Sequence, residues 1–76
     1  MKKEQIRAMQ DNGSLVAVHL LPNPAQSKEW ILMFKERGGR SHFLVSEAEQ
    51  IISFQTLETA LDALRSVGFK RAEIMF

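Results

Sequence analysis

The chain contains no cysteine, and this absence excludes both a disulfide framework and a thiolate zinc site. It fits a reducing, cytosolic setting. No run of about 18 or more apolar residues is present, as a membrane-spanning helix would need. The first residues also lack the pattern of a secretory signal peptide. We therefore expect a cytoplasmic protein with no membrane partner.

Net charge is also small. Ten Lys and Arg residues stand against nine Asp and Glu residues, which gives a formal net charge of +1, and the sequence pI is near 8.2. Domains that bind nucleic acid often have a pI above about 9. The overall charge therefore does not favour nucleic acid, and an electrostatic argument has to rest on local clustering.

Catalytic and metal-binding motifs are missing as well. The two histidines, His19 and His42, fall on different predicted strands without the spacing of metal ligands. No serine lies in a nucleophile elbow, and Gly38-Gly39 lacks the lysine and the strand-to-helix context of a phosphate loop. The sequence predicts a protein that is not an enzyme, holds no metal or cofactor and takes no small-molecule substrate.

The 76 residues suffice for one small domain, and a domain of this size buries only about 60% of its unfolded surface. Alternating and helical patterns predict a single α+β domain over residues 1–76, in the order α-β-β-β-(β)-α-β. We expect an antiparallel β-meander with a β-α-β end, and a main helix packed on one face of the sheet.

The N-terminal segment, residues 1–12, is rich in strong helix formers and precedes Gly13, a residue typical of helix ends. We predict a helix there. The alternative is a strand paired back through Asn12-Gly13, which is a hairpin dipeptide. Because the apolar side of the helix is thin, essentially Ile6 and Met9 with Ala8, the helix can be mobile.

The first strand is predicted over residues 14–21, where both alternating sets of side chains are apolar. This pattern is typical of a central strand that is covered on both faces. The segment Pro22-Asn23-Pro24 should end it, because proline cannot donate to a strand ladder and restricts the residue before it. A second, short strand pattern falls at residues 50–54.

The strongest helix pattern is Leu57–Val67, in which apolar residues recur at intervals of three and four. Thr56 precedes it as an N-cap and Gly68 follows it as a C-terminal stop. Residues 70–76 then alternate between apolar and polar, which predicts a last strand.

Gly38-Gly39 is the turn around which we expect the sheet to form, because both central residues of a type I′ turn need a positive φ. It joins a strand pattern at Trp30–Phe34 to another at Phe43–Val45. A two-residue loop sets Phe34 opposite Phe43. The predicted core face of this hairpin then collects Trp30, Leu32, Phe34, Phe43 and Val45.

The second face of the predicted hairpin has an apolar root and a basic tip. The root consists of Ile31, Met33 and Leu44, and the tip consists of Lys35, Arg37, Arg40 and His42. The tip is interpreted either as a contact for nucleic-acid phosphates or as a solvated turn whose charges protect the sheet edge. In this register the aromatic side chains lie on the opposite face, which argues against base stacking. A three-residue loop would shift the parity and scatter the basic cluster.

The apolar root matters because one amphipathic helix covers only one face of a sheet. Leaving Ile31, Met33 and Leu44 exposed to water favours association, so we expect a partner, most simply a second copy related by a two-fold axis. The alternative is that the N-terminal helix covers this face.

The order of these features resembles that of small proteins carried by bacterial plasmids and integrated elements, sometimes labelled partition-associated. The resemblance is carried by the polar N-terminal helix, the strand Leu15–Leu21, the Trp-led strand Trp30–Phe34, the segment FQTLETALDAL at 54–64 and Gly68-Phe69. It implies a bacterial accessory protein and transfers no catalytic residues.

Together these features predict a small non-enzymatic bacterial accessory or binding module. It would act through protein–protein contacts, as a homodimer or with another protein. The alternative is an accessory protein of nucleic acid that contacts phosphates through the basic hairpin tip.

Overall fold

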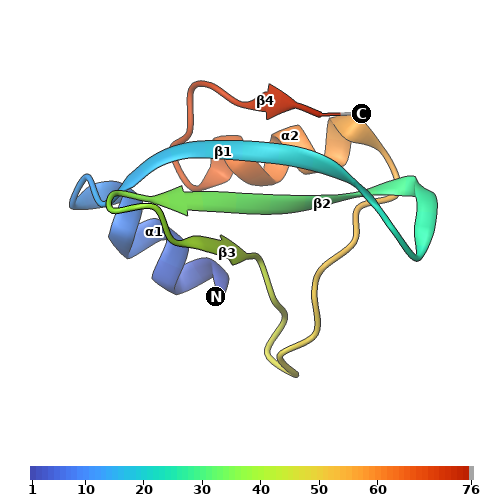
Figure 1. Cartoon of the computed structure of the whole chain (residues 1–76), viewed down its shortest axis with the longest axis horizontal. Coiled ribbons are helices and arrows are strands. Elements are labelled where there is room, and N and C mark those ends of the chain that lie inside the picture. Colours follow the sequence, from blue (N-terminus) through green and yellow to red (C-terminus); the bar gives the residue numbers. More distant parts are fainter. Residues whose placement is uncertain (76) are drawn as a thin grey trace.

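The computed structural model describes residues 1–75. In chain order the elements are α1 (Lys3–Asp11), β1 (Leu15–Asn23), β2 (Gln26–Glu36), β3 (Ser41–Phe43), α2 (Leu57–Ser66) and β4 (Glu73–Ile74). The strands form one sheet in the order β3-β2-β1-β4 (Figure 1). β4 is parallel to β1, and the other neighbours are antiparallel. The predicted α+β class and order of elements are confirmed.

Helix α2 begins where the sequence predicts and ends one residue earlier, at Ser66. The Thr56 hydroxyl accepts a hydrogen bond from the backbone N–H of Thr59 at 3.1 Å, which satisfies one of the free donors of the first turn. Gly68 follows the helix with a φ of +95°, a conformation that glycine adopts without steric cost.

Helix α1 confirms the helical prediction for the N-terminal segment over the alternative strand. The Arg7 side chain donates to the Ser66 carbonyl at the end of α2, at 3.0 Å. The amino group of Met1 donates to the Phe43 carbonyl at 2.9 Å. Ile6 is fully buried. These contacts hold α1 against α2 and the β3 edge of the sheet, although its apolar side is thin.

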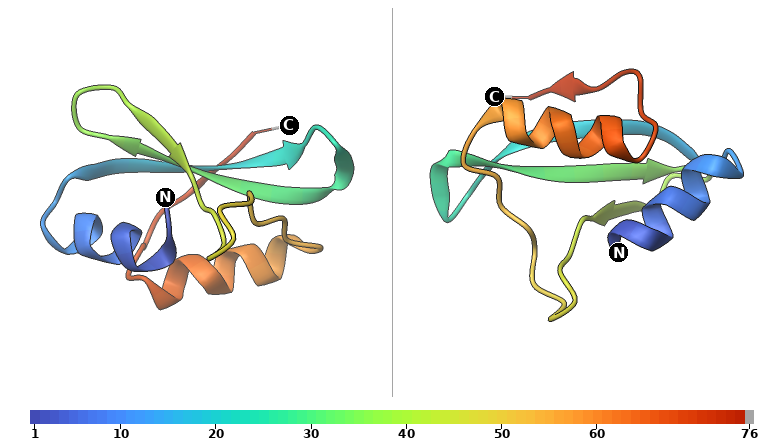
Figure 2. Two further views of the ribbon diagram at one scale, coloured as in Figure 1. Left: turned by 90° about the horizontal axis from the view of Figure 1, so that it is seen from below. Right: turned by 180° about the vertical axis from the view of Figure 1, so that it is seen from behind.

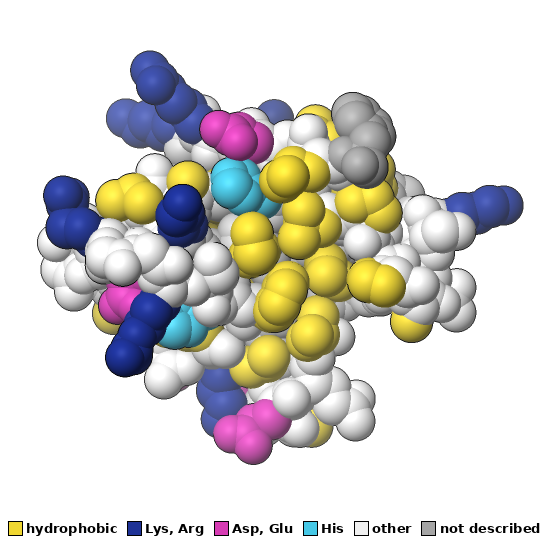
Figure 3. All heavy atoms as spheres, in the orientation of Figure 1, with side chains coloured by type: hydrophobic (Ala, Val, Ile, Leu, Met, Phe, Trp, Pro, Cys, Tyr) yellow, Lys and Arg dark blue, Asp and Glu magenta, His cyan; other side chains and the backbone are white. Residues whose placement is uncertain are grey.

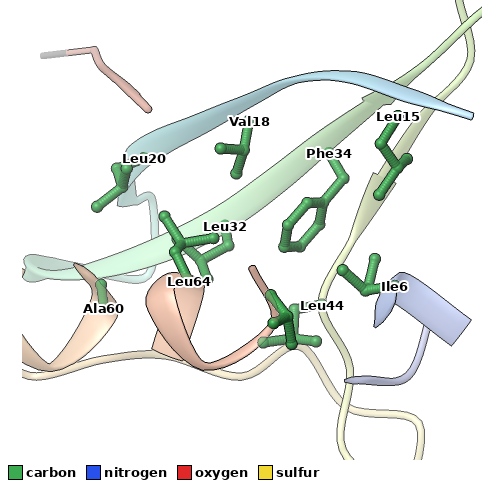
Figure 4. Close-up of a cluster of buried hydrophobic side chains, with 10 residues drawn as sticks. Ile6, Leu15, Val18, Leu20, Leu32, Phe34, Leu44, Ala60 and Leu64 are labelled. Carbon is green, nitrogen blue, oxygen red and sulfur yellow. The ribbon is translucent and has the colours of Figure 1, made fainter. Parts of the chain in front are cut away.

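Both helices pack on the same face of the sheet, as Figure 2 shows. Their buried side chains meet those of the strands in one core (Figure 4), which consists of Ile6, Leu15, Val18, Leu20, Leu32, Phe34, Leu44, Ala60, Leu64 and Val67. The alternative that α1 covers the second face is therefore wrong, because Ile6 belongs to the same core as α2.

Strand β1 is central but is covered on one face only, which differs from the prediction. Its pairing with β2 moves from Leu15↔Glu36 to Ala17↔Lys35, so that Val16 is an extra residue in a β-bulge. The bulge turns Leu15 into the core, where it is 8% exposed, and leaves Val16 53% exposed. A bulge changes the alternation of side chains locally, which the sequence pattern does not reveal.

Other strand ends differ from the prediction. β1 ends within the predicted segment Pro22-Asn23-Pro24, but two residues later than Leu21, because Pro22 pairs with Trp30 and the strand continues to Asn23. Residues 50–54 contribute two isolated bridges, Val45↔Ile51 and Trp30↔Phe54, in place of a strand. Of the predicted last strand at 70–76, β4 contains Glu73–Ile74, and Phe76 lies outside the described residues.

The predicted register of the β2–β3 hairpin is wrong by one residue. The Glu36 N–H donates to the Arg40 carbonyl at 2.7 Å, so the loop has three residues, Arg37 to Gly39, and both glycines have a positive φ. Phe34 consequently pairs with His42 and Met33 with Phe43. Because side chains alternate between faces, this shift exchanges the faces of all the residues after the turn.

Candidate functional site

The face of the sheet opposite the helices carries a continuous apolar area. Val18, Leu20, Leu32 and Phe34 point into the core (Figure 4), so their alternating neighbours point the other way. We call this surface the open face. By register it carries Ala17, His19, Leu21, Ile31, Met33, Lys35, Phe43, Glu73 and Met75. Figure 3 shows hydrophobic side chains gathered across its middle.

Side chains of the open face partly cover one another but have no second layer above them. Ile31 is 5% exposed and Met75 is 46% exposed, while Leu21, Met33 and Phe43 are half-buried. Apolar groups at this density on a water-facing surface mark an interaction site more often than singly exposed residues do.

The structure separates the residues predicted for the apolar root. Ile31 and Met33 lie on the open face as predicted. Leu44 does not, because its N–H bonds to the Leu32 carbonyl at 3.2 Å and its side chain lies in the core. Phe43 takes its place beside Met33. The candidate interface therefore contains an aromatic residue that the predicted register had assigned to the core.

The predicted basic tip is divided in the same way. Lys35 lies on the open face, whereas His42 shares the helix-covered side with Phe34 and its Nε2 lies 3.1 Å from a Glu36 carboxylate oxygen. The Arg37 guanidinium donates to the Gly13 carbonyl at 3.3 Å. Arg40 is exposed at the end of the turn. The four residues do not form one cluster, which is the outcome predicted for a three-residue loop.

His19 is the only titratable side chain on the β1 part of the open face. Its Nε2 lies 3.2 Å from a Glu73 carboxylate oxygen, and its Nδ1 is buried without a hydrogen-bond partner within residues 1–75. A neutral ring that donates from Nε2 to Glu73 satisfies this geometry, because it leaves only a lone pair at the buried nitrogen. The pair joins β1 to β4 and offers no free polar group at the centre of the face.

Two cations that were not among the predicted site residues lie across β1 from Lys35. Lys70 and Arg71 line a groove together with Ala17 and Val18 of β1, and Ala17 is the pairing partner of Lys35. Their position depends on the parallel pairing of β4 with β1. The only sequence signal was the Lys70-Arg71 pair itself, which does not indicate the strand that it approaches.

Comparison with protein-family models, curated proteins and solved structures found no match to this chain. Neither helix of the described part of the chain is long and apolar enough to cross a membrane. Residues 1–75 contain no group of three acidic, histidine or cysteine side chains that could hold a metal ion.

Proposed function

We propose that this chain is a non-enzymatic binding module that associates with a second copy of itself through the open face. The observation that carries the proposal is the position of the two helices. Because α1 and α2 both pack on one side of the sheet, neither helix covers the apolar side chains of the other side.

The size of the molecule sets an upper limit for the interface. The whole molecule measures 32 × 26 Å across the view of Figure 1, and the open face is a part of this outline. A specific protein–protein interface buries roughly 800 Å² of each partner, so a stable dimer would use most of the open face.

A second copy is the simplest occupant on energetic grounds. A 76-residue domain buries a small share of its unfolded surface and is marginally stable alone. Two sheets packed face to face, about 10 Å apart, would bury both copies of Met33 and Phe43 in a common core. Complete burial of such a side chain stabilises by about 1.5–3 kcal/mol relative to exposure, and a two-fold axis doubles the number buried.

The polar groups around the open face agree with this arrangement. Glu73 lies on the edge strand β4 with its side chain 74% exposed, so the middle of the face, at Leu21, Ile31 and Met33, carries no acidic or basic side chain. Charged side chains lie mainly around the apolar area in Figure 3, as the rim of an interface does. We place the module in the cytoplasm, as its lack of cysteine suggests, and its bacterial, plasmid-associated character stays a prediction.

Analytical ultracentrifugation over a concentration series tests the proposal. The wild-type chain should sediment with twice its mass of 8.7 kDa, and Met33→Lys should sediment as a monomer because it introduces a charge into the interface. The matched control is Ala8→Lys on the exposed side of α1, which adds the same charge outside the open face and should leave the dimer intact.

A wild-type chain that stays monomeric at every concentration would refute the proposal. So would a dimer that Met33→Lys leaves unchanged. Far-UV circular dichroism of each variant establishes that a loss of association is not a loss of fold. If Met33→Lys unfolds, Phe43→Ser provides a second, uncharged test of the same face.

A further inference from the structure

The basic side chains of this protein fall into two groups, those that contact a partner within the chain and those that do not. Four of the ten Lys and Arg side chains are engaged: Lys2 with Glu47, Arg7 with the Ser66 carbonyl, Arg37 with the Gly13 carbonyl and Arg65 with Asp62. Within residues 1–75 the other six form no ion pair or side-chain hydrogen bond. They are Lys3, Lys28, Lys35, Arg40, Lys70 and Arg71.

Four of these six free cations lie around one end of the sheet. Lys70 and Arg71 line the groove beside Ala17, and Lys35 pairs with Ala17 from the opposite side. Arg40 closes the turn that follows Lys35 in the hairpin. Figure 3 shows Lys and Arg side chains along this end of the molecule. We call Lys35, Arg40, Lys70 and Arg71 the basic edge.

The spacing of the basic edge suits an extended anion. Neighbouring strands lie about 4.8 Å apart, so Lys35 and the segment 70–72, on either side of β1, are roughly 10 Å apart. The Debye length is about 30 Å at 0.01 M salt, so at low salt the positive potentials of the two groups reinforce each other. Successive phosphates of a stacked nucleic-acid strand rise by about 3.4 Å, so the gap corresponds to about three nucleotides.

The one acidic side chain in the groove is Glu73, which lines it with Lys70 and Arg71. Its contact with His19 Nε2 at 3.2 Å orients the carboxylate and leaves its charge in place. The four cations of the basic edge outnumber this carboxylate, although the whole chain has a formal net charge of only +1.

We infer that the basic edge binds the phosphate backbone of a nucleic acid. All four side chains are exposed, so each contact is of the solvent-screened, counterion-releasing kind that recognises phosphates without reading bases. The site differs from the predicted hairpin tip, because it includes Lys70 and Arg71 and excludes Arg37 and His42. It does not depend on self-association, because only Lys35 of the four belongs to the open face, while Lys70 and Arg71 line a separate groove beside β1.

Fluorescence anisotropy of labelled single-stranded and duplex oligonucleotides, titrated with the full chain at low and at physiological salt, tests the inference. Saturable binding should weaken steeply with salt for both oligonucleotides and be indifferent to sequence. Lys70→Gln/Arg71→Gln should weaken binding at least about tenfold. It should also reduce the salt slope by about 0.9 for each duplex phosphate that the variant no longer neutralises.

The control Lys3→Gln/Lys28→Gln removes the same charge from two free cations outside the basic edge, and it should keep most of the wild-type affinity. Equal weakening by both double variants would overturn the inference, since binding would then follow net charge alone. Absence of binding at low salt would overturn it too. If poly-glutamate displaced the oligonucleotide at equal charge concentration, an acidic polypeptide would be the better-supported partner and the inference would be wrong.

Ultracentrifugation of the same double variants separates this inference from the proposed self-association. Lys70→Gln/Arg71→Gln should leave the oligomeric state unchanged while it weakens oligonucleotide binding. A dimer that does not bind nucleic acid would retain the proposed self-association and overturn the inference about the basic edge. A monomer that binds nucleic acid would do the reverse.

Discussion

The two faces of the sheet draw on similar side chains but have different surroundings. Leu20, Leu32 and Phe34 on one face lie beneath both helices, whereas Leu21, Ile31 and Met33 on the other lie beneath none (Figure 2). Alternation alone makes these two sets equivalent. The difference arises because α1, with little apolar surface, extends the cover of α2 along the same face. A strand that is apolar on both sides therefore indicates two packing surfaces, and the second of them can belong to another molecule.

The largest expected difference between the faces is in the free energy of unfolding. Phe34 is almost fully buried and its ring centroid lies 5.4 Å from that of Phe69. Phe34→Ala should therefore destabilise the fold by about 3–5 kcal/mol. Met33→Ala, its neighbour on the open face, should cost less than about 1 kcal/mol. Urea unfolding at a protein concentration low enough to populate monomers measures both, and equal losses would mean that the open face is packed within one chain.

The register of the hairpin predicts the next largest difference in the free energy of unfolding. It concerns Phe43, the last residue of β3, and Leu44, which follows it. Leu44→Ala should destabilise the monomer by about 2–4 kcal/mol because Leu44 lies in the core. Phe43→Ala should cost less than half as much, although Phe43 is the larger side chain. The reverse order in urea unfolding would indicate the two-residue loop, which places Phe43 in the core and Leu44 outside.

Self-association predicts that the stability depends on protein concentration. If unfolding and dissociation are coupled, each tenfold rise in concentration should raise the apparent free energy of unfolding by about 1.4 kcal/mol. Met33→Lys should remove this dependence, and Ala8→Lys should retain it. Thermal unfolding over a hundredfold range of concentration measures the effect, and a wild-type midpoint that does not move would count against the dimer.

The smallest expected effect tests the covered face alone. Thr56→Ala removes the side-chain acceptor for the Thr59 N–H and should destabilise the fold by about 1 kcal/mol. Thr56→Ser retains the hydroxyl and should restore most of the loss. Neither variant should alter the dimer dissociation constant, because α2 lies away from the open face. A change in that constant on ultracentrifugation would show that the two faces are coupled.

The predictions from sequence succeeded where the signal is local. Thr56 and Gly68 bound α2 as expected, and the helix formers of residues 1–12 do form α1. They failed where a shift of one residue in the strand register decides on which face of the sheet a side chain lies. The glycines at 38–39 are compatible with loops of two or three residues, and Val16 enters a bulge that depends on its pairing with β2. Each such step moves the following side chains to the other face.

The predictions of the candidate site residues were likewise correct where the signal is local and wrong where they depend on the strand register. Ile31 and Met33 were assigned to the open face correctly because they precede the turn, while Leu44 and His42, which follow it, were assigned to the wrong face. Lys70 and Arg71 were not included because nothing in their own segment shows that it returns beside β1.

The sequence by itself determined the fold class, the order of elements and the presence of more apolar strand surface than one helix can cover. These properties depend on composition and on periods of two and 3.6 residues, which are local. Only the tertiary structure decided which side chains share a face, that both helices cover the same one, and that Lys70 and Arg71 stand across β1 from Lys35. The physical reason is that strand register and helix placement are set by contacts between segments far apart in the chain, which local periodicity does not specify.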